Sequence, residues 1–206
     1  MSGFETEQEQ FWAGEFGDEY VDRSEGAAHI APRTAMWSRI LRSCAPIASA
    51  TEFGANIGLN LRALRNLLHE AELTGVEINA KAAQILRSEG TIKVLEGSLF
   101  DTAPSTPADL AFTCGVLIHI HPDRLAEAYD QLARGSRRYV VISEYYNPTP
   151  TQVVYRGHSE RLYKRDFAGE FLDMHSEFEL RDYGFIYHRD LVFPLDDVTW
   201  FLMERR

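Results

Sequence analysis

Short apolar segments alternate with amphipathic ones along the middle of this 206-residue chain. The apolar segments have the length of strands, whereas the segments between them carry apolar residues at helical spacing. The expected strands cover residues 47–53, 73–78, 91–95, 109–116 and 138–144, and the expected helices cover 58–70, 80–88 and 122–134. Strands joined by helices of this length predict an α/β fold, in which a parallel sheet is covered by helices on both faces.

The rest of the chain is expected to complete one domain with an N-terminal extension. Residues 1–31 are predicted to form the extension and 32–206 the single domain. The further elements expected in the domain are a helix over 32–44, a loop over 145–158, a helix over about 160–174 and two strands over 178–187 and 198–203. No helix separates the last two strands, which favours an antiparallel pair at the sheet edge.

The formal charge of −10 is concentrated at the N-terminus. Residues 1–25 hold eight acidic side chains against Arg23, a net of −7 (8 minus 1), so the remainder carries only −3. An acidic chain opposes binding to a phosphate backbone, which needs clustered positive charge. We therefore expect no nucleic-acid partner.

Two cysteines, Cys44 and Cys114, are too few and too far apart for a disulfide framework or a zinc site. The N-terminus is acidic and has no apolar signal core, and the longest apolar run, residues 110–120, is too short to span a bilayer. These features predict a soluble cytoplasmic protein with no bound metal and no membrane partner, and they leave open whether it is a monomer or a homodimer.

A glycine turn follows the first expected strand, and an acid ends the second. Gly54 and Gly58 allow a ligand to approach the backbone closely, and the helix that begins there offers free N–H groups. Glu77 lies about twenty residues further on, where doubly wound folds place an acid against ribose hydroxyls. The pair indicates a nucleoside ligand, although each feature alone could be merely structural. The G-x-G-x-x-G turn of dinucleotide-binding folds is absent, which disfavours a nicotinamide-dependent oxidoreductase.

Four successive segments, residues 52–58, 77–79, 97–100 and 115–120, resemble the cofactor motifs of class I S-adenosylmethionine-dependent methyltransferases. That resemblance implies a Rossmann-like fold with a mostly parallel seven-stranded sheet and a terminal antiparallel strand pair. The chain more narrowly resembles the pseudaminic acid biosynthesis-associated methylases, whose name records an association with sugar gene clusters. This narrower resemblance rests on residues 11–12, 15–20, 155–157, 164–167 and 187–200.

The resemblance also implies S-adenosylmethionine as cofactor and a set of contacts for it. Glu77 would accept from both ribose hydroxyls, Ile78 would pack on the adenine, and Ser98 with Leu99 would edge the ring. The methionine and ribose parts would lie against Glu52, Gly54, Asn56, Gly58, Asn60, Cys114 and Gly115. Trp12 and Tyr20 lie in the acidic extension, which we expect to fold over the cofactor as a lid.

His119 follows the fourth expected strand, at the sheet edge that faces the cofactor in this fold. A histidine there is a candidate general base near neutral pH, although it could equally support the loop. His121 is better explained as a neighbour of Pro122, and no third ligand accompanies the two histidines to make a metal site.

Aromatic and basic residues follow the fifth expected strand, where this fold receives its substrate. Arginine forks match carboxylate and phosphate oxygens, so the basic run indicates an anionic substrate. Alternatively, the run is a solvated helix start that pairs with Asp166, Glu170 or the acidic extension. The candidate substrate-binding residues are Tyr145, Tyr146, Arg156, His158, Arg161, Lys164 and Arg165.

The function expected from these features is methyl transfer from S-adenosylmethionine to a small anionic metabolite, for instance an acidic sugar or its nucleotide conjugate. An alternative within the same chemistry is O-methylation of a non-sugar carboxylate or phosphonate, which needs no strong base because the nucleophile is already ionised. A second alternative is a binding module that holds the cofactor without catalysis, which the presence of Gly54, Gly58 and Glu77 disfavours.

Overall fold

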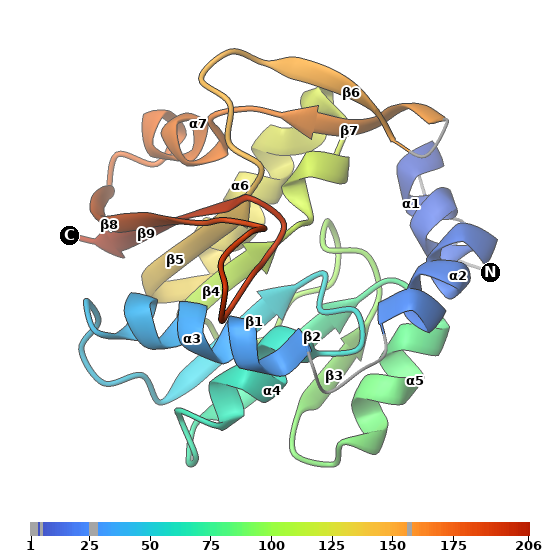
Figure 1. Cartoon of the computed structure of the whole chain (residues 1–206). Helices are drawn as coiled ribbons and strands as arrows, with labels where there is room; N and C mark the ends of the chain where they lie inside the picture. Colours follow the sequence, from blue (N-terminus) through green and yellow to red (C-terminus); the bar gives the residue numbers. More distant parts are fainter. Residues whose placement is uncertain (1–3, 5, 25–28, 156–157) are drawn as a thin grey trace.

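The computed structural model describes residues 4, 6–24, 29–155 and 158–206 (Figure 1). In this part of the chain a seven-stranded sheet has the order β3-β2-β1-β4-β5-β9-β8. Its strands are β1 (Ser49–Phe53), β2 (Glu72–Glu77), β3 (Lys93–Glu96), β4 (Ala108–Cys114), β5 (Ser136–Glu144), β8 (Phe178–Ile186) and β9 (Val198–Arg205). The first five run parallel, and β9 is antiparallel to both of its neighbours, so the predicted α/β sheet and its terminal antiparallel pair are confirmed.

Helices cover both faces of the sheet, as predicted (Figure 1). The helices of one face are α3 (Ile30–Leu41), α4 (Leu59–Arg65) and α5 (Ala80–Ser88), and those of the other are α6 (Leu125–Gly135) and α7 (Phe167–Met174). On the first face Trp37 packs edge-on against Phe112 of β4, with ring centroids 4.6 Å apart. On the second face Tyr129 and Phe171 fill the core. Burying these large side chains between the layers stabilises the sheet that carries the site.

The region between β5 and α7 corrects two sequence predictions. Residues 145–158 were expected to be a loop and 160–174 a helix, but a hairpin of β6 (Thr151–Tyr155) and β7 (His158–Lys164) occupies most of this stretch. The helix α7 begins only at Phe167, after Asp166, whose side chain accepts from the N–H of Gly169. Successive side chains of a strand point to opposite faces, and Leu162 of β7 points inward and is buried in the core. This burial favours a strand here, although turn-forming residues precede it in the sequence.

The N-terminal extension forms two short helices, α1 (Glu7–Ala13) and α2 (Glu15–Ser24), which lie at the carboxyl edge of the sheet near α5 (Figure 1). Thr6 and Glu9 form a capping box that starts α1. Asn79 donates to the carbonyl of Trp12 and to the carboxylate of Asp18, at 3.2 and 2.8 Å, and so attaches both helices to the end of β2. A Cβ at Gly17 would overlap the Trp12 carbonyl, so glycine permits this close approach.

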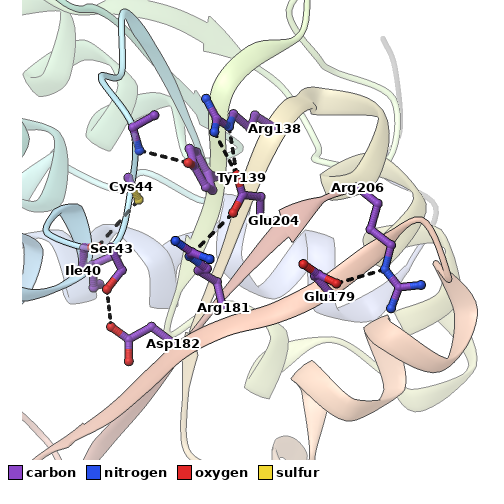
Figure 2. Close-up of polar contacts among 11 residues, drawn as sticks. Ile40, Ser43, Cys44, Arg138, Tyr139, Glu179, Arg181, Asp182, Glu204 and Arg206 are labelled. Carbon is purple, nitrogen blue, oxygen red and sulfur yellow. Dashed lines mark hydrogen bonds and ion pairs between the residues drawn. The ribbon is translucent and has the colours of Figure 1, made fainter.

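The opposite end of β5 and β9 carries a network of paired charges (Figure 2). The carboxylate of Glu204 in β9 forms ion pairs with the guanidinium groups of Arg138 in β5 and Arg181 in β8, with N–O distances of 2.9 and 3.6 Å. The hydroxyl of Tyr139 accepts from the backbone N–H of Ala45 at 2.9 Å, which ties the end of α3 to the sheet. In the described ranges no helix combines the length and the apolar character that crossing a membrane requires.

Candidate active site

A cavity of about 200 Å³ opens at the carboxyl edge of the sheet, under α1 and α2. The ends of β1, β2 and β4 form its floor, and α3 supplies one wall. Most of the residues that the sequence assigned to the cofactor or to catalysis line this cavity. They are Trp12, Tyr20, Glu52, Gly54, Asn56, Asn60, Glu77, Ile78, Ser98, Leu99, Cys114, Gly115 and His119.

The turn after β1 takes backbone conformations that few residues tolerate. Gly54 has φ +77° and packs against the side chain of Val116, and Asn56 has φ +47°, a region that asparagine enters more readily than most residues. Gly58, at φ +79°, begins α4 and faces Leu86 of α5, so it shapes the turn without lining the cavity. The glycines thus let the turn fold back beneath the cavity.

Glu77 ends β2 and is buried beside the turn. One carboxylate oxygen accepts from the N–H of Asn56 at 2.6 Å, and the other accepts from the N–H of Asn79 at 2.7 Å. Burial raises the pKa of Glu77, while the hydrogen bonds from the backbone oppose that rise. Each carboxylate oxygen has a second lone pair, so the side chain can still accept from two hydroxyls of a diol in the cavity.

Glu52 is the residue before the last of β1 and is 1% exposed. One of its oxygens accepts from the side-chain amide of Asn60 at 2.7 Å, and the Asn60 oxygen accepts from the indole N–H of Trp37 at 3.4 Å. The second oxygen, Oε2, is buried and has no hydrogen-bond partner in the part of the chain that is described. Burial raises the pKa of Glu52 to about 8, although Asn60 and the positive charge of Arg33 lower it. This carboxyl group is therefore suited to a cationic ligand group.

Arg33, which the sequence analysis did not single out, projects from α3 into the same cavity. One guanidinium nitrogen donates to the carbonyl of His29 at 2.8 Å, whereas its buried Nε finds no partner among residues 4, 6–24, 29–155 and 158–206. An arginine on an amphipathic helix carries no distinctive sequence signal, because most such residues face solvent. Here the positive charge of Arg33 lowers the pKa of the Glu52 carboxyl, and both side chains line the same cavity.

The loop after β4 is held by Glu144, a second residue that the sequence analysis missed. Its buried carboxylate accepts from the backbone N–H groups of Val116 and Leu117 at 3.0 and 3.1 Å, at the start of the 3₁₀ turn η2 (Leu117–His119). Burial raises the pKa of Glu144 to about 7 against these hydrogen bonds. The contact spans 27 residues or more along the chain, so only the fold reveals it.

His119 lies at the end of η2 and packs against Trp12 of α1, with ring centroids 4.6 Å apart. Its Nδ1 lies 2.6 Å from the carbonyl oxygen of Arg161 in β7. Burial lowers the pKa of His119 to about 4, so the imidazole is neutral at pH 7. The side chain is thus fixed between the extension and the hairpin, both of which are additions to the central sheet.

Apolar and polar groups line the opposite end of the cavity, after β2 and β3. Ile78 and Leu99 contribute aliphatic side chains, and Ser98, which is buried, accepts from the N–H of Phe100 at 3.3 Å. Gly97 takes φ +155°, and a Cβ there would meet Thr102, so glycine allows the chain to pass close to that side chain. A flat, largely apolar ring fits between two such aliphatic walls.

The predicted substrate-binding residues lie outside the cavity wherever the structure describes them. Lys164 lies over the ring of Tyr145 at 5.2 Å, Tyr146 packs near Phe201, and Arg165 pairs with Glu170 at 2.8 Å. The guanidinium of Arg161 pairs with Glu7 at 3.4 Å and lies over the ring of Phe11, while its carbonyl faces His119. Arg156 and the side chain of His158 fall outside the described residues.

The arrangement can bind a molecule with three different parts. Arg33 and Glu52 suit the carboxylate and the ammonium of an α-amino acid, Glu77 suits a diol, and Ile78 with Leu99 suits a flat ring. Gly115, where an added Cβ would meet nothing within 4 Å, keeps the space above β4 open.

Comparison with protein-family models finds no match for this sequence, and comparison with curated proteins finds none either. Solved structures do match. Magnesium protoporphyrin IX methyltransferase from Synechocystis PCC 6803, with bound S-adenosylmethionine, aligns over 100% of both chains at 13% identity and a TM-score of 0.72.

Two further structures show the same architecture. Mitomycin 7-O-methyltransferase aligns over 98% of this chain and 61% of its own, at 13% identity and a TM-score of 0.70. The 1,6-didemethyltoxoflavin-N1-methyltransferase of Burkholderia thailandensis, with S-adenosylhomocysteine and its substrate bound, aligns over 96% and 86%, at 18% identity and a TM-score of 0.67. The fold is therefore the Rossmann-like fold of class I methyltransferases, as the sequence predicted.

Proposed function

We propose that this protein is an S-adenosylmethionine-dependent methyltransferase that acts on a small anionic metabolite. The observation that carries the proposal is a pair of ionisable side chains, one from β1 and one from α3, that each hold a buried atom without a hydrogen-bond partner in the described part of the chain. Glu52 and Arg33 line one cavity, and neither Oε2 of Glu52 nor Nε of Arg33 has a hydrogen-bond partner in the described part of the chain. Buried polar atoms of this kind are rare, and a bound ligand is a common reason for them.

S-adenosylmethionine has the three parts that the cavity can bind. Its amino group would pair with Glu52, its carboxylate with Arg33, and its ribose diol with Glu77. The adenine would lie between Ile78 and Leu99, with Ser98 at its edge. The likeness to solved methyltransferases with this cofactor or its product bound supports the same placement. Cys114, Gly115 and the turn from Gly54 to Asn60 would border the methionine and ribose parts.

When bound, the cofactor supplies a methyl group on a positively charged sulfur, which is already activated for displacement. The protein then has to hold the acceptor in line with that methyl group and to accept a proton where the acceptor carries one. Glu144 fixes the loop that carries His119, and His119 is the proposed proton acceptor. Residues 1–31 act as a lid in this proposal, because α1 and α2 supply Trp12 and Tyr20 to the cavity.

The acceptor proposed here is an acidic sugar or its nucleotide conjugate. The sequence resemblance to methylases associated with pseudaminic acid supports it. Arg124 also lines the cavity, where its guanidinium lies 4.1 Å from the ring of Phe100 and donates to Glu127 at 2.8 Å. A negative group of the acceptor would share the Arg124 guanidinium with Glu127.

A thermal-shift panel tests the cofactor assignment. Purified protein is heated with S-adenosylmethionine, S-adenosylhomocysteine or NAD at equal concentration. A ligand present at 100 times its Kd adds about 2.7 kcal/mol to the free energy of unfolding, so the two sulfur ligands should raise the melting temperature by several degrees. NAD should not. Equal stabilisation by NAD, or none by either sulfur ligand, would contradict the proposal.

A further inference from the structure

The tautomer of His119 follows from one hydrogen bond. A carbonyl oxygen only accepts, so the 2.6 Å contact with Arg161 requires the proton on Nδ1. A neutral imidazole carries a single ring proton, and its lone pair is therefore on Nε2. The hairpin strand β7 thus sets the ring of His119 so that Nε2 is a hydrogen-bond acceptor.

Trp12 contributes a hydrogen-bond donor to the same cavity. An indole N–H can only donate, and in Trp12 this N–H is buried without a hydrogen-bond partner in the described ranges. The ring is fixed by edge contacts with Phe16 and Tyr20, at 5.4 Å each, and by the hydrogen bond from Asn79 to its carbonyl. Leaving such a donor unsatisfied costs about 1–3 kcal/mol, which a ligand oxygen would recover.

The two rings line the same cavity and lie 4.6 Å apart, so one small group bound against them can reach both. We propose that the methyl acceptor is a hydroxyl group, which accepts from Trp12 Nε1 and donates to His119 Nε2. A carboxylate could accept from Trp12 but has no proton for Nε2. A neutral amine has a single lone pair, which cannot both accept from Trp12 and form the bond to the methyl carbon, whereas a hydroxyl oxygen has two. This inference rests on the proposed methyltransferase function and narrows its substrate to an alcohol, including a sugar hydroxyl.

The transfer balances with these groups alone. The hydroxyl oxygen forms a bond to the methyl carbon while the carbon–sulfur bond breaks, and its electron pair stays on sulfur, which becomes a neutral thioether. The hydroxyl proton moves to Nε2 of His119, which becomes an imidazolium and later releases the proton to water. A strong base is not required, since an oxygen that has begun to bond to carbon holds its proton weakly.

Nuclear magnetic resonance of the full chain, saturated with S-adenosylhomocysteine, tests the inference without a known acceptor. Nitrogen-15 spectra of the imidazole at pH 7 should show the Nδ1–H tautomer of His119, which His119→Asn assigns by removing its signals. Glycerol then serves as the hydroxyl probe and acetate as the carboxylate probe. Glycerol should shift both His119 Nε2 and the Trp12 indole N–H, whereas acetate should leave Nε2 unshifted.

Substitutions test whether the rings of Trp12 and His119 both bind the hydroxyl group. Trp12→Phe, measured at a concentration of S-adenosylhomocysteine that saturates the variant, should weaken the glycerol-dependent shift at Nε2 at least threefold. Trp200→Phe is the matched control, because the Trp200 indole N–H is also buried and unbonded in the described chain but lies on β9, outside the cavity. It should leave the shift unchanged.

Several results would overturn the inference. They are an Nε2–H tautomer, a shift of Nε2 by acetate, no shift of Nε2 by glycerol, or an equal response in Trp12→Phe and wild type. Failure of S-adenosylhomocysteine to bind would instead overturn the proposed function, so the two failures are distinguishable.

Discussion

The two halves of the sheet differ in whether their ionisable side chains have partners. Where β5, β8 and β9 meet α3, charged side chains are paired at the surface, as the partly buried Glu204 is with the exposed Arg138 and Arg181 (Figure 2). At the carboxyl edge of β1, β2 and β4, Glu52 and Arg33 are held inside a cavity with atoms that nothing in the described chain satisfies. Ion pairs at the surface stabilise a fold weakly, whereas buried polar atoms without partners cost stability, and a ligand that pairs with them would recover that cost.

The largest effect on ligand binding is expected for the substitution Glu77→Gln. The amide keeps the size of the side chain but turns an N–H toward either Asn56 or Asn79, and it loses one acceptor for the ribose diol. Because a hydrogen bond to a charged group contributes about 1.5–3 kcal/mol, the affinity for S-adenosylhomocysteine should fall about 100-fold in isothermal titration calorimetry. Glu72→Gln, at the exposed start of the same strand, should bind like wild type; equal loss in both would contradict the role of Glu77.

The pH dependence of binding tests Glu52. In the ligand-free protein its pKa is about 8, and only the ionised carboxylate pairs with an ammonium group. The affinity for S-adenosylhomocysteine should therefore rise roughly tenfold between pH 6.5 and 8, with a proton released on binding. Calorimetry in buffers of different ionisation enthalpy measures that proton. Glu52→Gln should bind weakly with a flat profile, and a pH-independent wild type would refute the assignment.

The same pKa shift has a consequence for the stability of the ligand-free protein. The folded state holds the Glu52 proton more tightly than the unfolded state, whose pKa is near 4.5. The stabilisation is full below that pH and is lost as the pH rises through about 8, by at most about 1.4 kcal/mol per pH unit. Denaturation between pH 6.5 and 8 should show a shallower decline in Glu52→Gln than in wild type. The raised pKa of Glu144 also makes stability decline with rising pH, but it does so equally in wild type and in Glu52→Gln.

A smaller effect is expected at the lid. Gly17→Ala adds a Cβ that overlaps the carbonyl of Trp12 and meets the amide of Asn79, so α1 and α2 must move away from the end of β2. The affinity for S-adenosylhomocysteine should fall about fivefold, or about 1 kcal/mol, with little change in melting temperature. Glu19→Ala, at an exposed position of α2, is the control. Unchanged affinity in Gly17→Ala would contradict the proposed role of residues 1–31 as a lid over the cofactor.

The least effect is expected in the paired half of the sheet. Glu204→Gln removes the charge that Arg138 and Arg181 share, but ion pairs with exposed arginines contribute little, so the melting temperature should fall by about 2 °C or less. Binding of S-adenosylhomocysteine, measured by calorimetry, should not change. A marked loss of binding would mean that the two halves are not independent.

Much of the fold could be predicted because its signals are local. The alternation of strands and helices, the glycine turn at Gly54 and the acid at Glu77 are each visible within a short window of sequence. The hairpin of β6 and β7 was missed because Pro148 and Pro150 suggested a loop, while its inward residue, Leu162, is recognised only once the core is known. Strand pairing between segments of uncertain periodicity depends on such tertiary contacts.

The site was predicted unevenly for the same reason. Residues in the turn and at the strand ends were found, since parallel strands bring their carboxyl ends to one edge. Arg33 and Glu144 were missed, because the first is one arginine on an ordinary helix and the second acts on a backbone 27 residues away. The basic run from 155 to 165 drew attention by its charge, but the arginines described there are occupied by Glu7 and Glu170.

The most direct test of the central claim compares two ligands in the same calorimetric titration. S-adenosylhomocysteine and 5′-methylthioadenosine share the nucleoside, but only the first has an amino-acid end for Arg33 and Glu52. Wild type should bind S-adenosylhomocysteine at least 100-fold more tightly. Arg33→Met should lose most of that preference, whereas Arg39→Met, at an exposed position of the same helix, should keep it. Equal affinity of wild type for the two ligands would contradict the account.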